Sequence, residues 1–418
     1  MKKIHPIKGA VQNYAWGGDS YIPKLLRIEN ADNQPFAEIW LGAHQRGPAT
    51  LIDNGESISL NQWIAKNQDA LGEMVVEKFG NRLPYLFKVL DVNKMLSIQS
   101  HPTKKAAEIG FERENKAGIS LTARDRNYKD DNHKPEVMIA MTDFWLLHGF
   151  KSADEIEAVL NEYSEFEPLR KYFVEKDIYH LYKTIMEMSQ EEVDEILLPL
   201  KENLNRAFRR NQLLKSRPSY WAALAFRDME LEGGHCDRGI FSIYLFNLVG
   251  LKKGEGIFQD AGIPHAYLEG VNMELMANSD NVFRGGLTVK HIDVKELLEH
   301  LVFEPVVPNI LKGEEIQKGV KVFKTPAPDF ELTQIELKDF QDYEAKEVVT
   351  PETLIVMKGE VMVDNGDEEY RMSRGDAFFV PAGASYSMIS EGKAEIYKAA
   401  VPVSVSYTHL TLPTTPYV

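Results

Sequence analysis

The alternation of hydrophobic and polar positions divides this chain into a β-rich part, a helical part and a second β-rich part. Short apolar runs bounded by turn residues predict strands in the first part, at 36–42, 84–90, 95–99 and 137–150. From Ser152 to about Asn211 the apolar residues recur at helical spacing instead. Strands are expected again from Phe241 onward, with glycines between them. Short strands joined by glycine and proline turns favour a sandwich or barrel over parallel α/β units.

Two serine residues predict helix starts in the middle part. Ser152 precedes acidic residues, as is typical of a helix N-cap. Ser189 precedes Glu192 by three positions, which is the pattern of a capping box. This part is therefore predicted to be a helical insert whose charged runs are solvent-exposed faces. Upstream of it, the polar stretch 101–136 is expected to form helical pieces and loops.

Two segments of the later β-rich part repeat one pattern. The segments 254–265 and 375–386 have equally spaced glycines, a paired or single aromatic residue and a shared Ala-Gly. The first segment ends in His265, where the second has Tyr386. We infer two related β-units, of which only the earlier keeps an imidazole.

Composition narrows the class of protein. The 418 residues are 44% hydrophobic and 27% charged, which suits two or three soluble domains of ~100–200 residues each. No apolar run reaches the ~20 residues of a membrane span, and no secretion-signal core follows the N-terminus. The single cysteine, Cys236, excludes an internal disulfide and fits a reducing cytoplasm; with His235 it is expected in a surface loop. A net charge of −15 argues against nucleic acid but not against a small anionic substrate.

Four residues could hold a metal ion. Gln99 and His101 lie two positions apart in a strand-like segment, so both side chains can face one object. Glu136 opens an apolar run, where a carboxylate needs a partner. His265 follows a Gly-Ile-Pro turn at the start of a strand. Two nitrogen and two oxygen ligands suit Zn²⁺, while Fe²⁺ and Mn²⁺ stay open from ligand type alone.

Cationic residues suggest an anionic ligand nearby. Arg284 is delivered by a polar loop and followed by two glycines, which suits close approach to an anion. Lys88 lies within an apolar run, so it either extends outward or faces a polar cavity. His133 also stands out, directly before a predicted strand. Glu274, by itself, reads as a solvated strand residue. The other histidines are expected to be surface, capping or core groups, at positions His5, His44, His148, His180, His291 and His300.

Taken together, these segments resemble the type I mannose-6-phosphate isomerase (phosphomannose isomerase) family, a zinc-dependent group with the cupin fold. The matching segments occur in the family's order and cover residues ~10 to ~400. They are Asn13-Tyr-Ala-Trp-Gly17, Glu38-Ile-Trp-Leu-Gly42, Pro84-Tyr-Leu-Phe-Lys-Val-Leu90, Leu96-Ser-Ile-Gln-Ser-His-Pro102, Asp131-Asn-His-Lys-Pro-Glu136, Gly262-Ile-Pro-His-Ala-Tyr-Leu268 and Asn278-Ser-Asp-Asn-Val-Phe-Arg284. The chain departs from the family's usual pattern at Gln259-Asp260, Gly285-Gly286 and Val289.

The resemblance implies a fold and an assignment of residues. The expected fold is mainly β with a helical insert: a cupin-type double-stranded β-helix (jelly roll) catalytic domain and a second, metal-free cupin-like β domain. By position, the zinc ligands would be Gln99, His101, Glu136 and His265, with one Zn²⁺ per chain. Arg284 would be the active-site arginine. The substrate pocket would be lined by Lys88, Ser97, Lys134, Tyr267, Glu274 and Lys290.

The implied reaction interconverts mannose 6-phosphate and fructose 6-phosphate. Proton transfer between C1 and C2 through an enediol needs a base and a means of stabilising an oxyanion. Glu274 and His133 are candidates for the base, and Lys134 would require a depressed pKa. Two other functions stay open: an Fe²⁺-dependent cupin oxygenase and a non-catalytic sugar-binding cupin.

The resemblance also predicts domain boundaries. The catalytic cupin domain would take residues 1–151 and 233–320, the helical insert 152–232 and the C-terminal cupin-like domain 321–403. Residues 404–418 lack Asp, Glu, Lys and Arg, resemble a translated adapter sequence, and are set aside with His409. The expected partner is a small phosphorylated sugar in the cytoplasm, with neither nucleic acid nor membrane. The sequence is compatible with a monomer but does not set the oligomeric state, the catabolic or biosynthetic role, or the cation that binds phosphate.

Overall fold

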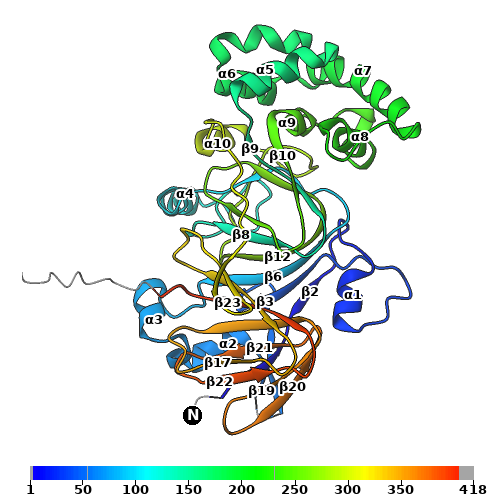
Figure 1. Cartoon of the computed structure of the whole chain (residues 1–418). Helices are drawn as coiled ribbons and strands as arrows, with labels where there is room; N and C mark the ends of the chain where they lie inside the picture. Colours follow the sequence, from blue (N-terminus) through cyan, green and yellow to red (C-terminus); the bar gives the residue numbers. More distant parts are fainter. Residues whose placement is uncertain (1–2, 54, 230, 404–418) are drawn as a thin grey trace, which may run out of the picture.

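The computed structural model describes residues 3–53, 55–229 and 231–403, so the predicted non-native tail at 404–418 lies outside the described residues. Figure 1 shows the helices of the insert at one end, a first β-unit in the middle and a second β-unit at the other end. The prediction of a mainly β, cupin-like protein with a helical insert is confirmed.

The first β-unit is a ten-stranded sheet organised around one long strand, β12 (His265–Ala277). The beginning of β12 pairs with β7 (Gln99–Ser100) and β9 (Phe144–Phe150), and its remainder pairs with β6 (Tyr85–Val92) and β8 (Glu136–Ala140). The long strand therefore joins two groups of strands that fold over a common interior. The other strands of this sheet are β2 (Ala10–Gln12), β3 (Glu38–Gly42), β10 (Phe246–Leu251), β11 (Gly256–Gln259) and β13 (Phe283–Arg284).

The interior of the first unit has an apolar floor. Four apolar residues, one on each of β6, β8, β9 and β11, pack together with Tyr267. They are Leu90, Met138, Leu146 and Ile257. Alternation along a strand places residues two positions away on the same face. The residues at those neighbouring interior positions are polar, and they form the site described below.

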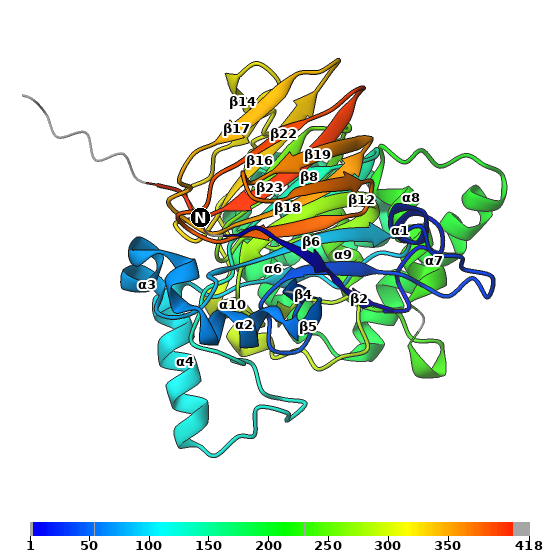
Figure 2. The same ribbon diagram turned by 90° about the horizontal axis from the view of Figure 1, so that it is seen from below.

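The second β-unit combines strands from both ends of the chain. Its nine-stranded sheet has the order β14–β15–β16–β23–β18–β21–β1–β4–β5, and Figure 2 shows β16, β23 and β18 side by side. The hydrogen bonding therefore crosses the boundary expected at residue 321, because β1 pairs with β21. These strands are β14 (Glu314–Gln317), β15 (Val320–Phe323), β16 (Glu331–Leu337), β23 (Ala394–Ala400), β18 (Glu352–Lys358), β21 (Ala377–Val380), β1 (His5–Lys8), β4 (Thr50–Asp53) and β5 (Glu56–Ser59). A four-stranded sheet faces it, with β17 (Asp342–Ala345), β22 (Tyr386–Ile389), β19 (Glu360–Asp364) and β20 (Glu369–Ser373).

The two β-units share a hydrophobic core. Val89 and Met273 of the first unit pack in one buried cluster with Leu332, Ile355 and Tyr397 of the second. The side chains on the outer face of β6 and β12 are therefore covered, which explains why the outer face of these strands is apolar although it faces away from the interior of the first unit.

The helical insert begins as the serines predict. Ser152 and Ser189 each form a complete capping box, at the starts of α5 (Ala153–Glu162) and α7 (Gln190–Arg209). The helices α6 (Ile178–Glu187) and α8 (Pro218–Asp228) complete this group. Elsewhere in the chain lie α1 (Tyr21–Leu26), α2 (Leu60–Lys66), α3 (Glu73–Phe79), α4 (Lys104–Lys116) and α10 (Val294–His300).

Three local predictions are wrong. The strand expected from Phe241 is preceded by a helix, α9 (Gly239–Leu245), because this fully buried run packs against the insert and not in a sheet. Of the strand expected at 95–99 only the last residue is in β7, since the preceding backbone bonds irregularly to Tyr267 and Gly286. Cys236 is buried in the helical core and not in an exposed loop, although His235 beside it is exposed and bonds Asp194.

The repeated segments have the same form in both β-units. In each, a strand (β11 or β21) leads through a turn to a second strand (β12 or β22) that begins at His265 or Tyr386. The turn glycines Gly262 and Gly383 have φ values of 77° and 82°, a conformation that favours glycine. The internal repeat seen in the sequence is thus a repeat of structure. No helix of the described residues is long and apolar enough to cross a membrane.

Candidate metal centre and active site

His101, Glu136 and His265 converge in the interior of the first β-unit. The Nε2 atoms of His101 and His265 lie 3.5 and 3.4 Å from the two carboxylate oxygens of Glu136. One ligand atom from each of the three residues falls within 4.8 Å of the others, and all three residues are buried. Two imidazole nitrogens and a carboxylate at these distances can surround one metal ion.

The sheet brings Gln99 to the same place. Gln99 in β7 is the register partner of His265 in β12, and on its other side it pairs with Arg284 in β13. Directly opposed residues of antiparallel strands project from the same face. The side chains of Gln99, His265 and Arg284 therefore face the interior together.

The orientation of each histidine is fixed through its other ring nitrogen. Nδ1 of His101 lies 2.8 Å from the carbonyl oxygen of Asn281, and Nδ1 of His265 lies 2.9 Å from that of Ile263. A proton on Nδ1 donates to the carbonyl and leaves Nε2 as an acceptor, which is the usual arrangement of a metal-binding histidine. Asn281 is in turn anchored, because its side-chain amide donates to the carbonyl oxygens of Asp130 and Asn132.

The residues present fit a divalent metal. Nε2 of His101 is buried and has no hydrogen-bond partner among the described residues. Burial, with the positive charge of Lys134, lowers the pKa of His101 to about 4, so its imidazole is neutral at neutral pH. Burial alone would raise the pKa of Glu136, but Lys134 and His101 hold it well below its usual value. Neutral imidazoles and an ionised carboxylate are the protonation states in which these side chains bind metals.

A buried ion pair lies beside this group. Nζ of Lys88 in β6 is 2.9 Å from Oε2 of Glu274 in β12 and 3.6 Å from Glu38 in β3. Oη of Tyr267 donates to Oε1 of Glu274 at 2.9 Å, and Trp40 Nε1 donates to Glu38. Lys88 thus faces a polar interior, which is one of the two alternatives open from the sequence.

For Lys88 and for Glu274, burial and the charge of the partner residue shift the pKa in opposite directions. Burial alone would lower the pKa of Lys88, but Glu274 and Glu38 raise it above the ordinary lysine value. Burial raises the pKa of Glu274, an effect that Lys88 opposes and the charge of Glu136 increases. A carboxylate whose pKa is raised is a stronger proton acceptor than an ordinary carboxylate.

The remaining predicted residues lie in different surroundings. Nζ of Lys134 is 3.0 Å from Oε1 of Glu136, so Lys134 adjoins the candidate metal ligands. Nε2 of His133 instead contacts the buried carboxylate of Asp329 at 2.8 Å. Ser97 is partly buried in the loop before β7, and Lys290 is exposed beyond β13. Although Lys290 is exposed to solvent, partial burial among its neighbours and the nearby charge of Arg284 lower its pKa.

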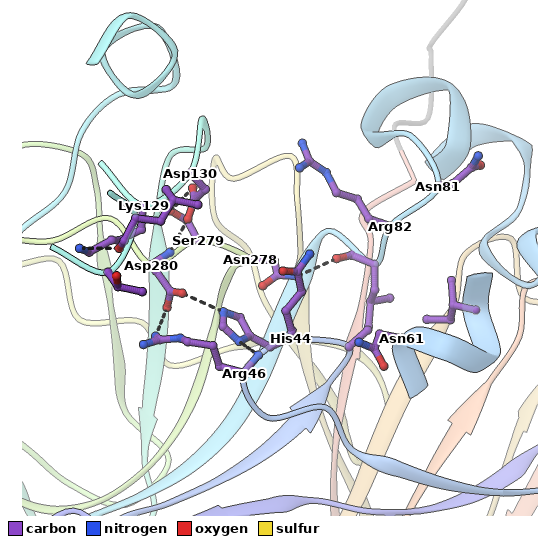
Figure 3. Close-up of a pocket in the computed structure, with 16 residues that line it drawn as sticks. His44, Arg46, Asn61, Asn81, Arg82, Lys129, Asp130, Asn278, Ser279 and Asp280 are labelled. Atoms are coloured by element: carbon purple, nitrogen blue, oxygen red, sulfur yellow. Dashed lines mark hydrogen bonds and ion pairs between the residues drawn. The ribbon is translucent and has the colours of Figure 1, made fainter. Parts of the chain in front are cut away.

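A cavity of about 860 Å³ is lined in part by Asp280, the residue before Asn281, whose carbonyl oxygen orients His101. Figure 3 shows His44 and Arg46 directed at Asp280 on its wall, and Nε2 of His44 is 3.3 Å from that carboxylate. The pKa of Asp280 is about 2, because His44, Arg46 and Lys134 outweigh the effect of its burial. Of the described residues that line this cavity, none is one of the three converging ligands.

Four residues that complete these surroundings are not among the predicted site residues. Glu38 opens an apolar strand, the same signal that singled out Glu136. Asp280 and Asn281 lie within the polar loop that was examined for Arg284. His44 carried no signal, because its role depends on a contact with a residue far along the chain.

The fold and the site define a cupin-fold protein with a candidate metal centre of two histidines and a carboxylate. A family model described as phosphomannose isomerase type I, catalytic domain, matches residues 4–153, and a cupin domain model matches residues 346–398. The mannose-6-phosphate isomerase of Escherichia coli (strain K12) is 35% identical over 383 residues, covering 90% of this chain and 94% of that protein. The human protein of that name is 34% identical over 416 residues, covering 92% and 95%.

Solved structures are similar over nearly the whole chain. One is the mannose 6-phosphate isomerase from Salmonella typhimurium bound to its substrate (F6P) and zinc, with a TM-score of 0.84 and 33% identity, covering 96% of this chain and 100% of that one. A zinc-bound holo mannose 6-phosphate isomerase gives the same values. The chain belongs to the type I phosphomannose isomerase family, as the motifs in its sequence predicted.

Proposed function

We propose that this protein is a zinc-dependent aldose–ketose isomerase that interconverts mannose 6-phosphate and fructose 6-phosphate. The observation that carries the proposal is the convergence of His101, Glu136 and His265 beside the buried Lys88–Glu274 pair. This arrangement lies in a chain whose relatives are named for that activity and include structures with zinc and F6P.

His101, Glu136 and His265 would hold the zinc, and Gln99 would be the fourth protein ligand. The register pairing of Gln99 with His265 supports its inclusion. Zinc, when bound, supplies a Lewis acid that stabilises negative charge on the oxygens of the substrate. One Zn²⁺ per chain is proposed.

Glu274 is the group that we assign to proton transfer. It is buried, its pKa is raised, and Lys88 and Tyr267 hold its two oxygens in place. A positioned carboxylate can remove the proton from C2 of mannose 6-phosphate and return it to C1, forming and consuming an enediol. His133, the other candidate, has its Nε2 engaged by Asp329.

Cationic side chains would bind the negative charges of the substrate. Arg284 faces the interior beside Gln99, and Lys134 lies at Glu136. With Lys290 and the partly buried Ser97, they would supply local positive charge to a chain with a net charge of −15. One of these groups would meet the phosphate and another the developing oxyanion.

The proposed partner is accordingly a small phosphorylated sugar, and the proposed location is the cytoplasm. A single cysteine in the chain supports a reducing compartment.

The test is an activity assay after metal removal. Chelated protein should lose the interconversion of the two hexose 6-phosphates, and added Zn²⁺ should restore it. Oxygen uptake with Fe²⁺ would instead support a cupin oxygenase, and binding without turnover would support a sugar-binding cupin. Zinc-replete protein that does not interconvert the two sugars would refute the proposal.

A further inference from the structure

The cavity of about 860 Å³ lies at one end of the strands that carry the proposed site. One row of register partners crosses β3, β6, β12 and β8 there, and it consists of Gly42, Leu86, Met276 and Glu136. Just past this row the backbone N–H of Asn278 donates to the carbonyl oxygen of Pro84, and both Asn278 and Leu83 line the cavity. The cavity therefore adjoins the end of the first β-unit at which the proposed ligand Glu136 lies.

Trp40 in β3 connects the wall of this cavity to the interior. The ring of His44, which lines the cavity, meets the Trp40 ring edge-on with 4.9 Å between the centroids. Nζ of Lys88 lies 5.5 Å from the centroid of the same indole, within the range of a cation–π contact. A residue of the cavity wall and a residue of the proposed site thus contact one side chain.

Arg46 is fixed on this wall with most of its guanidinium open. Its Nη2 donates to Oδ1 of Asp280, and its backbone N–H donates to Nδ1 of His44 at 3.2 Å (Figure 3). Nε2 of His44 lies 3.3 Å from the other oxygen of Asp280, so the two side chains hold the Arg46 loop together. Among the residues that the structure describes, the guanidinium has no other hydrogen-bond or ion-pair partner. Its remaining N–H groups are available to an anion.

The charges on the wall favour an anion, because its carboxylates are engaged and its arginines are open. The charged residues that line the cavity are Arg46, Arg82, Lys129, Asp130 and Asp280. The carboxylate of Asp130 accepts from the Ser279 hydroxyl and from the backbone N–H of Asp280, each at 2.7 Å. The side chains of Arg46 and Arg82 are 65% and 55% exposed. An anion that enters the cavity therefore meets unsatisfied guanidinium donors and no free carboxylate of the described wall.

Arg46 also lies within electrostatic reach of cations proposed to bind the substrate. Burial lowers the pKa of Lys129 and of Lys290, and the positive charges of Arg284 and Arg46 lower both further. The same two arginines thus act on a lysine of the cavity wall and on a lysine of the proposed substrate pocket. The positive charge at the cavity is continuous with that of the proposed site.

We propose that the cavity is the entrance to the proposed isomerase site and that Arg46 captures the phosphate of the incoming sugar there. Its volume of about 860 Å³ is within the range of ~300–1,000 Å³ that small-molecule sites occupy. Arg46 draws the anion to the cavity, Arg284 and the lysines of the site then bind it, and Arg46 takes no part in the chemical step. The inference rests on the proposed function, since the captured anion is the substrate.

The test is the salt dependence of kcat/KM in zinc-replete Arg46→Glu. At about 10 mM salt, where charges act over ~30 Å, kcat/KM for mannose 6-phosphate should fall about 10-fold, with kcat changed less than about 2-fold. At about 1 M salt the screening length is ~3 Å, and the variant should agree with the unaltered protein within about 2-fold. Arg46→Gln removes the charge without reversing it and should lose about 3-fold at low salt.

The matched control is Arg209→Glu, which makes the same change of charge at the exposed end of α7, outside the cavity. It should leave kcat/KM within about 2-fold at either salt concentration. An unchanged kcat/KM of Arg46→Glu at low salt would overturn the inference. So would a loss that persists at high salt, or an equal fall in kcat, because either would show that Arg46 acts on the bound substrate and not on its capture.

A second measurement does not depend on turnover. Gln45→Cys places a thiol on the exposed wall beside Arg46, whereas the native Cys236 is buried. The rate of its reaction with anionic dithiobis(nitrobenzoate), divided by that with neutral dithiodipyridine, reports the attraction of anions, because both reagents meet the same thiolate. Adding Arg46→Glu should lower this ratio about 10-fold at low salt, and an unchanged ratio would overturn the inference by itself. Should the unaltered zinc-replete protein show no isomerase activity, the proposed function fails, and the ratio still decides whether Arg46 draws anions to the cavity.

Discussion

Lys88 and Glu274 face each other across β6 and β12 as register partners, with Nζ 2.9 Å from Oε2. Both are buried, with 7% and 3% of their surface exposed. Each charge compensates the other inside the protein, so the pair fixes the electrostatics of the site before any substrate arrives.

Replacing Lys88 alone should therefore destabilise the protein. Lys88→Met leaves the Glu274 carboxylate buried without its nearest cation, and we expect a loss of about 3–5 kcal/mol in unfolding free energy. Urea denaturation of metal-free protein measures it. The double variant with Glu274→Leu should recover most of that loss, and a double variant no more stable than Lys88→Met would contradict this account.

Metal content should distinguish the proposed ligands from the proposed substrate groups. His265→Ala removes a ligand and should weaken zinc binding by more than about 100-fold, measured by competition with a chelator. Arg284→Ala should keep its zinc and lose turnover by about 100-fold or more, because it would stabilise charge on the substrate. Loss of zinc from both variants would assign Arg284 a structural role.

The buried histidines should make the metal-free protein sensitive to mild acid. His101 and His148 have pKa values of about 4, below the 6.5 of an ordinary histidine, because burial disfavours their charged forms. Between pH 6.5 and 4 the unfolded chain binds these protons and the folded chain does not, so stability falls as the pH falls. The loss is up to about 3 kcal/mol for each histidine.

Unfolding free energies measured from pH 7 to 4 check this expectation. His148→Leu should show a shallower decline than the unaltered protein over this range. Parallel curves for the two proteins would show that His148 is not neutral in the folded state.

The second β-unit should depend on an ion pair and not on a metal. Tyr386, which stands where the first unit has His265, donates to Glu352 at 2.7 Å, and Nζ of Lys398 contacts the same carboxylate at 2.7 Å. Lys398→Met should cost about 3–5 kcal/mol of stability without changing the zinc bound per chain. Elemental analysis and denaturation measure the two quantities, and a loss of zinc in folded Lys398→Met would contradict the expectation.

Features that depend on nearby residues could be predicted from the sequence. The capping boxes at Ser152 and Ser189 are formed within four residues, and both are present in the structure. The repeat that ends in His265 and Tyr386 was visible because its turns need glycine at fixed positions. The family motifs could likewise be recognised because each is a short run of neighbouring residues.

Features that depend on distant pairing could not be predicted. The run at 239–245 is as apolar as a buried strand, and only its packing against the insert makes it a helix. Gln259 was visible as a departure from the family's pattern, but its contact with His148 requires β9 and β11 to be placed first. The same holds for Asp329, whose pairing with His133 joins two β-units.

The position of β1 sets an order of events during synthesis. His5 in β1 pairs with Phe379 in β21, so the hydrogen bonds between these two strands cannot form until residue 379 has left the ribosome. The strands of the first unit are complete once Arg284 has been made, long before this. We expect the first unit to fold early, with the apolar outer face that includes Val89 and Met273 uncovered until the strands of the second unit have been made. Ribosomal stalling between the codons for Arg284 and Phe379 would thus leave a chain whose first unit has formed and whose apolar outer face is open to contact with other chains.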